Sequence, residues 1–270
     1  MNQQPYFVVN AFTYRPFSGN PAAVVPLDRW PRDEWLHKIA NQMNLSETAF
    51  FVPAGTGFEL RWFTPKVEVD LCGHATLATA CVLSHRGQLA AKASVEFSTR
   101  SGVLKASRQG SRFELDFPID RESPADQPAG LLESLNIQLR YLGRGKFDYL
   151  VEVDSEPALR SISPDFQLLA KVPCRGVIVT CPSSDPQFDF VSRFFSPATD
   201  VNEDPVTGSA HCCLADFWGR RLNKTALIGY QASPRGGIVH VEVRGERVLL
   251  AGEATIFAEG SIMSHPPDSN

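Results

Sequence analysis

The sequence predicts an α+β protein made of two similar halves, each with short strands around one buried helix. The segment FELRWFTPKVEVD at 58–70 recurs as FVSRFFSPATDVN at 190–202. Five residues are identical at a constant offset of 132, namely Phe58, Arg61, Phe63, Pro65 and Val69. Short runs of β-branched, aromatic or alternating residues outnumber the helical segments. Two helical segments, ATLATACVLS after His74 and SAHCCLADFWG from Ser209, are apolar on nearly every face, which is typical of enclosed helices. A duplicated strand, turn and helix start therefore predicts a pair of similar lobes.

The first lobe is predicted to span 1–117. Its strands are expected at 6–12, 22–25, 48–52, 58–63, 94–99 and 112–117, where hydrophobic or alternating runs occur. The segment PRDE at 31–34 has the proline and the acidic residues of a helix start. We therefore expect a surface helix over 35–44 that packs Trp35, Ile39 and Met43 inward.

The second lobe is predicted to span 131–270, with the option that its last strand packs back on the first lobe. The preceding segment PIDRESPADQPAG, 118–130, is rich in Pro, Asp and Ala and lacks a hydrophobic period, so it is interpreted as a linker. Strands in this lobe are expected at 149–153, 176–180, 188–195, 238–243 and 248–251. The repeat resumes after a three-residue insertion at an offset of 135, where Gly73-His74-Ala75 corresponds to Gly208-Ser209-Ala210.

The composition excludes several classes of protein. The chain has 270 residues, 43% of them hydrophobic, and a formal net charge of −4, which suits two globular domains. It has no basic run, so neither a nucleic acid nor an anionic membrane is expected as a partner. It has no cationic leader and no apolar stretch of about 18 residues, which favours a cytoplasmic protein. Its six cysteines form no C-x-x-C pair, which favours free buried thiols over disulfides or a metal site.

Both apolar helices begin just after a turn that contains glycine, Gly73 in the first lobe and Gly208 in the second. Helix N-termini carry about half a positive charge and unpaired N–H groups. If the lobes face each other about a pseudo-two-fold axis, two such ends would converge on one cavity and hold a carboxylate or a developing enolate. The alternative is that both glycines merely supply tight turns. The residues expected to contact the substrate are Gly73, Gly208, Thr207, Cys72 and Asn20.

One difference between the repeats points to an acid/base residue. The strand sequence at 49–53 aligns with 178–182, and on that register Glu47 falls opposite Gly176. One lobe therefore has a carboxylate where the other has no side chain, in a segment, LSETAFF, whose hydrophobic pattern gives it no role. A carboxylate among aromatic residues is suited to proton transfer. The competing interpretation is an exposed or helix-terminal glutamate, which is the usual location of this residue type.

Three further residues distinguish the two helix starts. They are His74 in the first, Asp204 in the loop NEDPVTG, and Ser209 in the second. Together they suggest a hydrolase, but no G-x-S-x-G elbow is present, and Ser209 follows a glycine as a capping residue would. His74 is placed to act as a donor beside the proposed anion site. Asp204 either caps the second helix or orients His74 across the cleft.

Five motifs follow one another along the chain. They are FSGNPAAVV (17–25), LSETAFF (45–51), DLCGHATLA (70–78), NEDPVTGSA (202–210) and QASPRGG (231–237). In this order and spacing, and over nearly the whole chain, they resemble the PhzF-like isomerases, named for a protein of phenazine biosynthesis. The resemblance implies a diaminopimelate-epimerase-like fold, in which two pseudo-symmetric lobes each wrap a mostly antiparallel sheet round a central helix. It also implies a cofactor-free site between the lobes and a homodimer.

The resemblance also assigns roles to residues. The family's acid/base Glu corresponds to Glu47, its site His to His74, and its Asp and Ser to Asp204 and Ser209. The family's best-known activity isomerises a dihydro-hydroxyanthranilate by moving a proton from one ring carbon to another, with the Glu as the shuttle. A single carboxylate suffices for such a shift if it can return the proton that it has taken.

The expected function is a cofactor-independent isomerase that moves a proton on a small carboxylate-bearing metabolite, cyclic in the family's known case, with Glu47 as acid and base. Two alternatives stay open. Diaminopimelate epimerases use two cysteines, one at each helix start, and here Cys72 occupies the first such place but Thr207 the second. An amino-acid racemase or epimerase that uses Cys72 is one alternative, and a non-catalytic small-anion-binding protein on the same scaffold is the other. Neither a cofactor nor a metal is expected.

Overall fold

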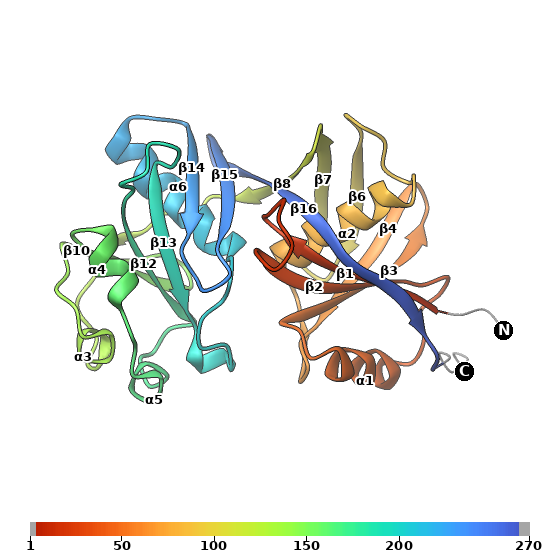
Figure 1. Ribbon diagram of the computed structural model, residues 1–270, viewed down its shortest axis with the longest axis horizontal. Coiled ribbons are helices and arrows are strands. Elements are labelled where there is room, and N and C mark those ends of the chain that lie inside the picture. The colour runs from red at the N-terminus through yellow and green to blue at the C-terminus, as the bar shows by residue number, and fades with distance from the viewer. Residues whose placement is uncertain (1–3, 265–270) are drawn as a thin grey trace. The chain divides into compact units, whose positions relative to one another are not determined.

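The computed structural model describes residues 4–264, and the chain divides into two compact units (Figure 1). Unit 1 holds the described residues up to Asp116 together with those from Ala251 onward, and unit 2 runs from Phe117 to Leu250. The last strand, β16 (Arg247–Ile262), therefore has residues in both units. None of the described helices combines the length and the hydrophobicity that crossing a lipid bilayer requires.

The strands of unit 1 form a closed sheet. Their order is β1 (Gln4–Ala11), β2 (Asn20–Pro26), β3 (Glu47–Ala54), β4 (Gly57–Phe63), β6 (Ser94–Thr99), β7 (Gly102–Gln109), β8 (Arg112–Pro118) and β16, which also pairs with β1. The pairs β2–β3 and β4–β6 are parallel. The pairs β1–β2, β3–β4, β6–β7 and β7–β8 are antiparallel. A short strand, β5 (Glu68–Val69), pairs with β4 outside this order.

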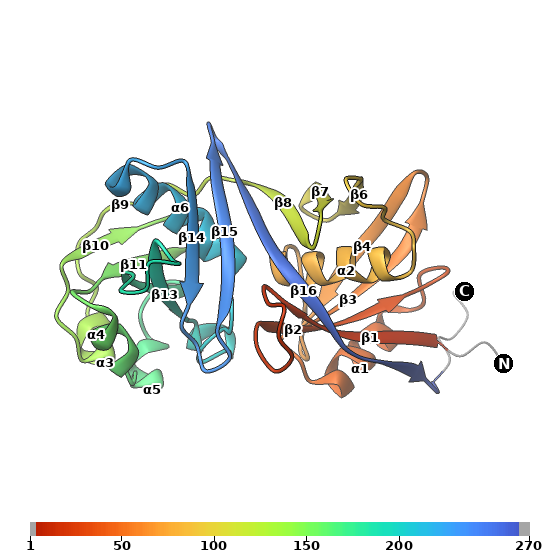
Figure 2. The same ribbon diagram turned by 45° about the horizontal axis from the view of Figure 1, so that its top comes forward.

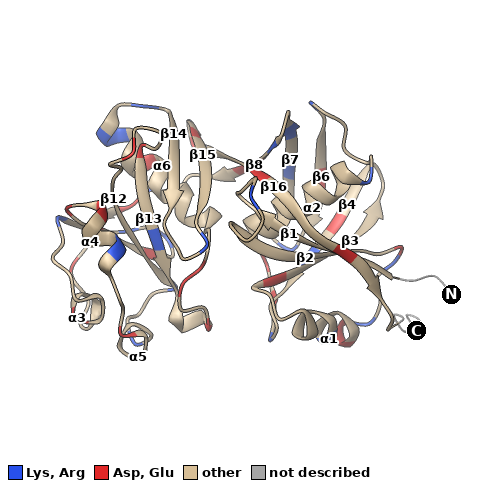
Figure 3. Ribbon diagram, in the orientation of Figure 1, with Lys and Arg blue, Asp and Glu red and all other residues tan. Residues whose placement is uncertain are grey.

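Helix α2 (Gly73–His85) is the buried helix of unit 1. It packs against β1, β2, β3 and β7 (Figure 2). Every residue from His74 to Leu83 is buried. It carries no Lys, Arg, Asp or Glu along its length (Figure 3). A helix covered on every side needs an apolar sequence on every side, which is the pattern that predicted it. Helix α1 (Asp33–Met43) packs against β3 and β4, and it buries Trp35 and Ile39 as predicted.

Unit 2 repeats this plan with an open sheet. After β16 the order is β15 (Gly237–Arg244), β14 (Ala226–Gln231), β13 (Phe190–Phe195), β12 (Gly176–Pro182), β11 (Asp148–Glu152), β10 (Tyr141–Arg144) and β9 (Ser123–Pro124). Helix α6 (Gly208–Leu222) packs against β14 and β15. The predicted linker, 118–130, belongs to this unit, where β9 pairs with β10.

The two faces of β12 serve different helices. Val177 and Val179 join a core with the short helices α3 (Leu131–Leu135), α4 (Glu156–Ser161) and α5 (Phe166–Leu169). Thr180 points the other way, because neighbouring residues of a strand alternate, and its hydroxyl accepts a hydrogen bond from Trp218 of α6 at 3.0 Å. The central helix therefore lies on one face of the sheet and the short helices on the other.

The duplicated arginines make the same ion pair in both units. Arg61 donates through Nε and Nη2 to Glu68, at 2.7 Å each. Arg193 donates in the same way to Glu203, at 2.7 and 2.9 Å. Glu203 lies 135 positions after Glu68, so the insertion precedes it and coincides with a short 3₁₀ helix, Pro197–Thr199. The sequence alignment, which kept the offset of 132 as far as 202, placed the insertion too late.

Several elements gave no signal in the sequence. These are β7, β10, β14 and the short helices α3, α4 and α5. In β7 only Ala106 is fully buried, so the strand lacks the alternation of apolar and polar residues that identifies a half-buried strand. The three helices have four to six residues each, which is too short for a helical period to be recognised.

Candidate active site

Four of the predicted residues meet at one edge of the unit 1 sheet. Asn20 begins β2, Glu47 begins β3, Cys72 is the N-cap of α2, and His74 is the second residue of that helix. Strands β2 and β3 are parallel neighbours, with Ala22 opposite Glu47, so both begin at the same edge. Helix α2 packs against both strands and starts at this edge as well.

The cluster is compact and mostly buried. Nε2 of His74 lies 3.1 Å from Oε2 of Glu47, and Nδ1 lies 3.6 Å from Sγ of Cys72. Nδ2 of Asn20 lies 3.3 Å from the same Nδ1. His74 and Cys72 are each 6% exposed, whereas the Glu47 side chain is 19% exposed. Glu47 is thus the most accessible of the three groups that can exchange a proton.

The charges of this cluster are coupled. Burial, together with the charge of Glu47, raises the pKa of the Cys72 thiol. Burial disfavours the imidazolium of His74, but its neighbours Cys72 and Glu47 outweigh burial and raise its pKa well above the usual range. Because Cys72 stays a thiol near neutral pH, the carboxylate of Glu47 is the charge that favours the imidazolium. A proton on Nδ1 also requires the Asn20 amide to present its oxygen rather than its nitrogen.

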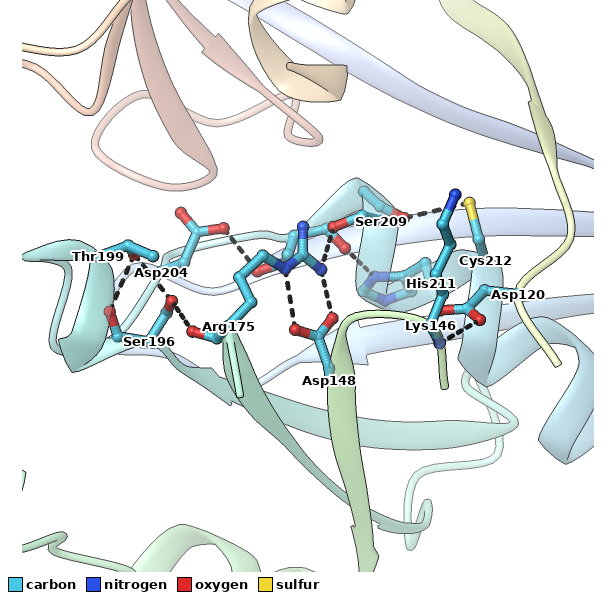
Figure 4. A network of polar contacts seen from close by, with 12 residues as sticks. Asp120, Lys146, Asp148, Arg175, Ser196, Thr199, Asp204, Ser209, His211 and Cys212 are labelled. Atoms are coloured by element: carbon cyan, nitrogen blue, oxygen red, sulfur yellow. Dashed lines mark hydrogen bonds and ion pairs between the residues drawn. The ribbon is translucent and has the colours of Figure 1, made fainter. Parts of the chain in front are cut away.

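In unit 2, hydrogen bonds hold the loop that leads into α6 (Figure 4). Thr207 is the N-cap of this helix, and its hydroxyl donates to Oδ2 of Asp204 at 2.5 Å. Gln231 accepts from the N–H of Thr207 at 2.9 Å and donates to the carbonyl of Asp204 at 2.7 Å. Ser233 donates to the carbonyl of Pro205 at 2.8 Å. The QASPRGG motif therefore supports the first turn of α6.

Arg175 lies beside the first turn of α6. Its Nη2 donates to Oγ of Ser209 at 3.0 Å, and its Nε donates to Oδ1 of Asp148 at 2.9 Å (Figure 4). Nη2 also bonds to the second oxygen of Asp148, a residue that is almost completely buried. Burial raises the pKa of Asp148, although Arg175 opposes this. Burial alone would lower the pKa of Arg175, but Asp148 raises it, so the guanidinium stays charged.

The two units place different chemistry at corresponding positions. His74 and Ser209 are each the second residue of a central helix, at the offset of 135. Each contacts a side chain at the start of the corresponding strand, Glu47 in unit 1 and Arg175 in unit 2. Unit 1 therefore presents a carboxylate with an imidazole, which suits proton transfer. Unit 2 presents a guanidinium with a hydroxyl at a helix N-terminus, which suits an anion.

The structure assembles the predicted residues as two groups, one within each unit. The first is Asn20, Glu47, Cys72, Gly73 and His74, and the second is Asp204, Thr207, Gly208 and Ser209. Sequence reasoning missed Arg175 and its partner Asp148. One signal was available, because Arg175 directly precedes Gly176, the residue that aligned with Glu47.

The fold of the chain matches a known one. A probable proline racemase from Agrobacterium radiobacter K84 superposes with a TM-score of 0.63, covering 98% of this chain and 94% of that one. At 13% identity, this likeness establishes the fold alone. Two sheet-and-helix units of this kind define an α+β protein with the diaminopimelate-epimerase-like fold.

Closer similarities identify the family. Residues 9–260 match the family model described as phenazine biosynthesis-like protein. An uncharacterized isomerase of Pseudomonas aeruginosa is 51% identical over 95% of this chain and 97% of its own length. The crystal structure of a phenazine biosynthesis PhzF-family protein from Enterococcus faecalis is 41% identical, with a TM-score of 0.93, over 97% of this chain and 100% of that one. The chain belongs to the PhzF family, and its enzyme class is isomerase.

Proposed function

We propose that this isomerase moves a proton between two carbons of a small carboxylate-bearing substrate, without a cofactor, and that Glu47 is both base and acid. The observation that carries the proposal is the pairing of an accessible Glu47 carboxylate with a buried imidazole at 3.1 Å, at a position where the other repeat has no acid. A proton acceptor held this way can release the same proton again. The substrate is a carboxylate with an acidic C–H next to a double bond.

The proposed reaction has two steps. Glu47 takes the proton from a carbon beside the double bond, and the electron pair moves along the conjugated system. Glu47, now neutral, returns the proton to the far carbon, so the substrate's composition is unchanged. His74, whose Nε2 lies 3.1 Å from Glu47, would hold the carboxylate in place through the cycle.

In this proposal unit 2 contributes anion binding. The first turn of α6 offers the N–H groups of Gly208 and Ser209 at a helix N-terminus, with the Arg175 guanidinium 3.0 Å from the Ser209 hydroxyl. Asp204 acts by holding Thr207, the N-cap of that helix. Substitutions in this group are expected to raise KM more than they lower kcat.

The test is deuterium uptake from D₂O into β,γ-unsaturated carboxylates, acyclic and cyclic, followed by NMR. The wild-type protein is expected to deuterate the far carbon and shift the double bond, because the abstracted proton exchanges with solvent while Glu47 holds it. Glu47→Gln should lower the rate at least a hundredfold, whereas Glu47→Asp, which keeps a carboxylate, should retain part of it. Equal rates for Glu47→Gln and wild type would rule out this role.

The racemase alternative assigns the proton to Cys72. Two observations weigh against it: burial raises the pKa of the Cys72 thiol, and the N-cap of α6 is Thr207, whose hydroxyl donates to Asp204. The same NMR experiment separates the two functions. A racemase returns deuterium to the carbon that lost the proton, and its double bonds do not move. Cys72→Ser should then abolish the exchange.

A further inference from the structure

The Glu47–Cys72–His74 cluster also has the composition of a transition-metal site. A carboxylate oxygen, a thiol sulfur and an imidazole nitrogen all lie within 4.8 Å of one another. Within residues 4–264, no other group of three or more His, Cys, Asp and Glu side chains is arranged in this way. The sequence gave no sign of it, because metal-site motifs are recognised by close cysteine or histidine spacing and Glu47 lies 25 positions before Cys72.

The distances between the three ligand atoms suit an ion with tetrahedral coordination. Zinc takes Cys, His and Glu ligands at about 2.0 to 2.3 Å, which places the ligand atoms roughly 3.3 to 3.6 Å from one another. Nε2 of His74 is 3.1 Å from the Glu47 oxygen and 4.0 Å from the Cys72 sulfur. The Glu47 oxygen and the Cys72 sulfur lie within 4.8 Å of each other, so shifts of up to roughly 1 Å would complete the three-ligand set. A mixture of sulfur, nitrogen and oxygen donors favours zinc over magnesium or calcium, which prefer oxygen alone.

A second observation supports a ligand at this place. Oε2 of Glu47 is inaccessible to solvent, and no described residue gives it a contact of hydrogen-bond geometry. Its 3.1 Å approach to His74 is an ion-pair distance only. A buried carboxylate oxygen normally accepts a hydrogen bond. This oxygen accepts none, so it has a lone pair available for a metal ion beside the Cys72 sulfur and the His74 nitrogen. Asn20, next to Nδ1 of His74, can hold the ring while Nε2 binds the ion.

We propose that Glu47, Cys72 and His74 bind one Zn²⁺ ion and that the bound ion inhibits the enzyme. Binding replaces the proton of the Cys72 thiol and the Nε2 proton of the His74 imidazolium with the metal, so two protons leave with each ion bound. Three protein ligands leave a fourth position open to water or to a carboxylate. The inhibition rests on the proposed function, because the ion occupies the Glu47 carboxylate that would accept the substrate's proton. The binding of Zn²⁺ does not depend on the proposed function.

The duplication supplies a comparison within the same chain. In unit 2 the corresponding positions hold Gly176, Thr207 and Ser209. Glycine offers no side-chain ligand, and neutral hydroxyls are poor ligands for zinc. The proposed site therefore exists in unit 1 alone, and the predicted stoichiometry is one ion per chain.

The experiment is a titration of the chelator-treated full chain with Co²⁺ and then with Zn²⁺. A single Co²⁺ should produce a thiolate-to-metal charge-transfer band, and one equivalent of Zn²⁺ should remove it. Calorimetry in two buffers of different ionisation enthalpy should report about two protons released per Zn²⁺. Cys72→Ser should abolish the band and weaken Zn²⁺ binding at least tenfold, and His74→Gln should weaken it similarly. Cys174 is a partly exposed cysteine outside the cluster, so Cys174→Ser should change neither the charge-transfer band nor the Zn²⁺ affinity.

Two results would overturn the proposal. One is a Zn²⁺ affinity weaker than about 100 μM for the wild-type chain, which amounts to less than about 5.5 kcal/mol of binding. The other is a charge-transfer band that persists in Cys72→Ser, provided that circular dichroism shows this variant to be folded. Binding is measured without substrate, so the metal site can be confirmed even if no carboxylate undergoes proton exchange. Exchange that is insensitive to saturating Zn²⁺ would overturn the inhibition.

Discussion

His211 offers a test of how burial in unit 2 couples stability to pH. It is completely buried on α6, Nδ1 lies 2.8 Å from the carbonyl oxygen of Thr207, and no described residue bonds to Nε2. Burial lowers the pKa of this imidazole to about 4. In unit 1 a smaller residue bonds to the corresponding carbonyl. Thr76, at the place in α2 that corresponds to His211, donates its hydroxyl to the carbonyl of Cys72 at 2.6 Å. We therefore choose His211→Thr as the perturbation.

The sign and size of the effect follow from the two pKa values. The unfolded chain protonates this imidazole near pH 6.5, whereas the folded chain keeps it neutral down to about pH 4. In that window the unfolded state binds more protons, so stability is fully present above pH 6.5 and is lost as the pH falls. Between pH 7.5 and pH 5 the expected loss through His211 is about 2 kcal/mol.

Urea unfolding at pH 7.5 and pH 5 measures this loss. Trp218 reports on unit 2, since its ring stacks on Phe190 with centroids 6.1 Å apart. His211→Thr is expected to lower stability at pH 7.5 by about 1 to 3 kcal/mol, because the smaller side chain leaves a cavity. It should also reduce the pH-dependent loss by about 2 kcal/mol. His85→Gln, at a half-exposed site, is the control and should leave that loss unchanged. If His211→Thr keeps the full pH dependence, the reasoning is refuted.

Three further predictions concern the two units. Gly176→Ala should lower the melting temperature by an amount that corresponds to about 1 to 3 kcal/mol, because a Cβ there would overlap the Phe194 ring; an unchanged melting temperature would contradict this. Arg193→Met should cost more unfolding free energy in urea than Arg61→Met, because Arg193 also donates to two backbone carbonyls, whereas the further bond of Arg61 goes to the exposed Asp33; equal costs would contradict this. Arg175→Lys should raise KM about tenfold in steady-state kinetics with little change in kcat, since lysine lacks the second branch that reaches Ser209; a fall in kcat alone would argue against anion binding.

The segment at 58–70 that recurs at 190–202 made the two-unit plan predictable, because a repeated strand, turn and helix start predicts two similar lobes. The enclosed helices were also predictable, since their sequences are apolar on nearly every side. The position of the insertion was not. Val69 and Val201 are identical at the offset of 132, but the ion pairs of Glu68 and Glu203 show that the structural offset there is already 135. A chance identity at this position misled the alignment.

Part of the candidate site followed from comparing the repeats, and part depended on contacts that no comparison reveals. Glu47 was found because it stands opposite a glycine. Arg175 was missed because its partner Asp148 lies 27 positions earlier and begins a different strand, so nothing in the local sequence marks the pair. The Zn²⁺ cluster was missed for the same reason. Strand pairing of β2 with β3, and packing of α2 on both, create the neighbourhood.

The glycine opposite Glu47 explains why the two repeats differ at this place. A Cβ at Gly176 would meet the Phe194 ring and the backbone carbonyl of Phe195, so this strand start has no room for a side chain. Unit 2 therefore cannot hold a second carboxylate in the position that Glu47 occupies. The residue before it, Arg175, takes over the contact with the central helix, and it brings a positive charge balanced by Asp148. Because this position has no room for an acid, the two helix starts cannot do the same chemistry. Proton transfer in unit 1 and anion binding in unit 2 are the division that this asymmetry favours.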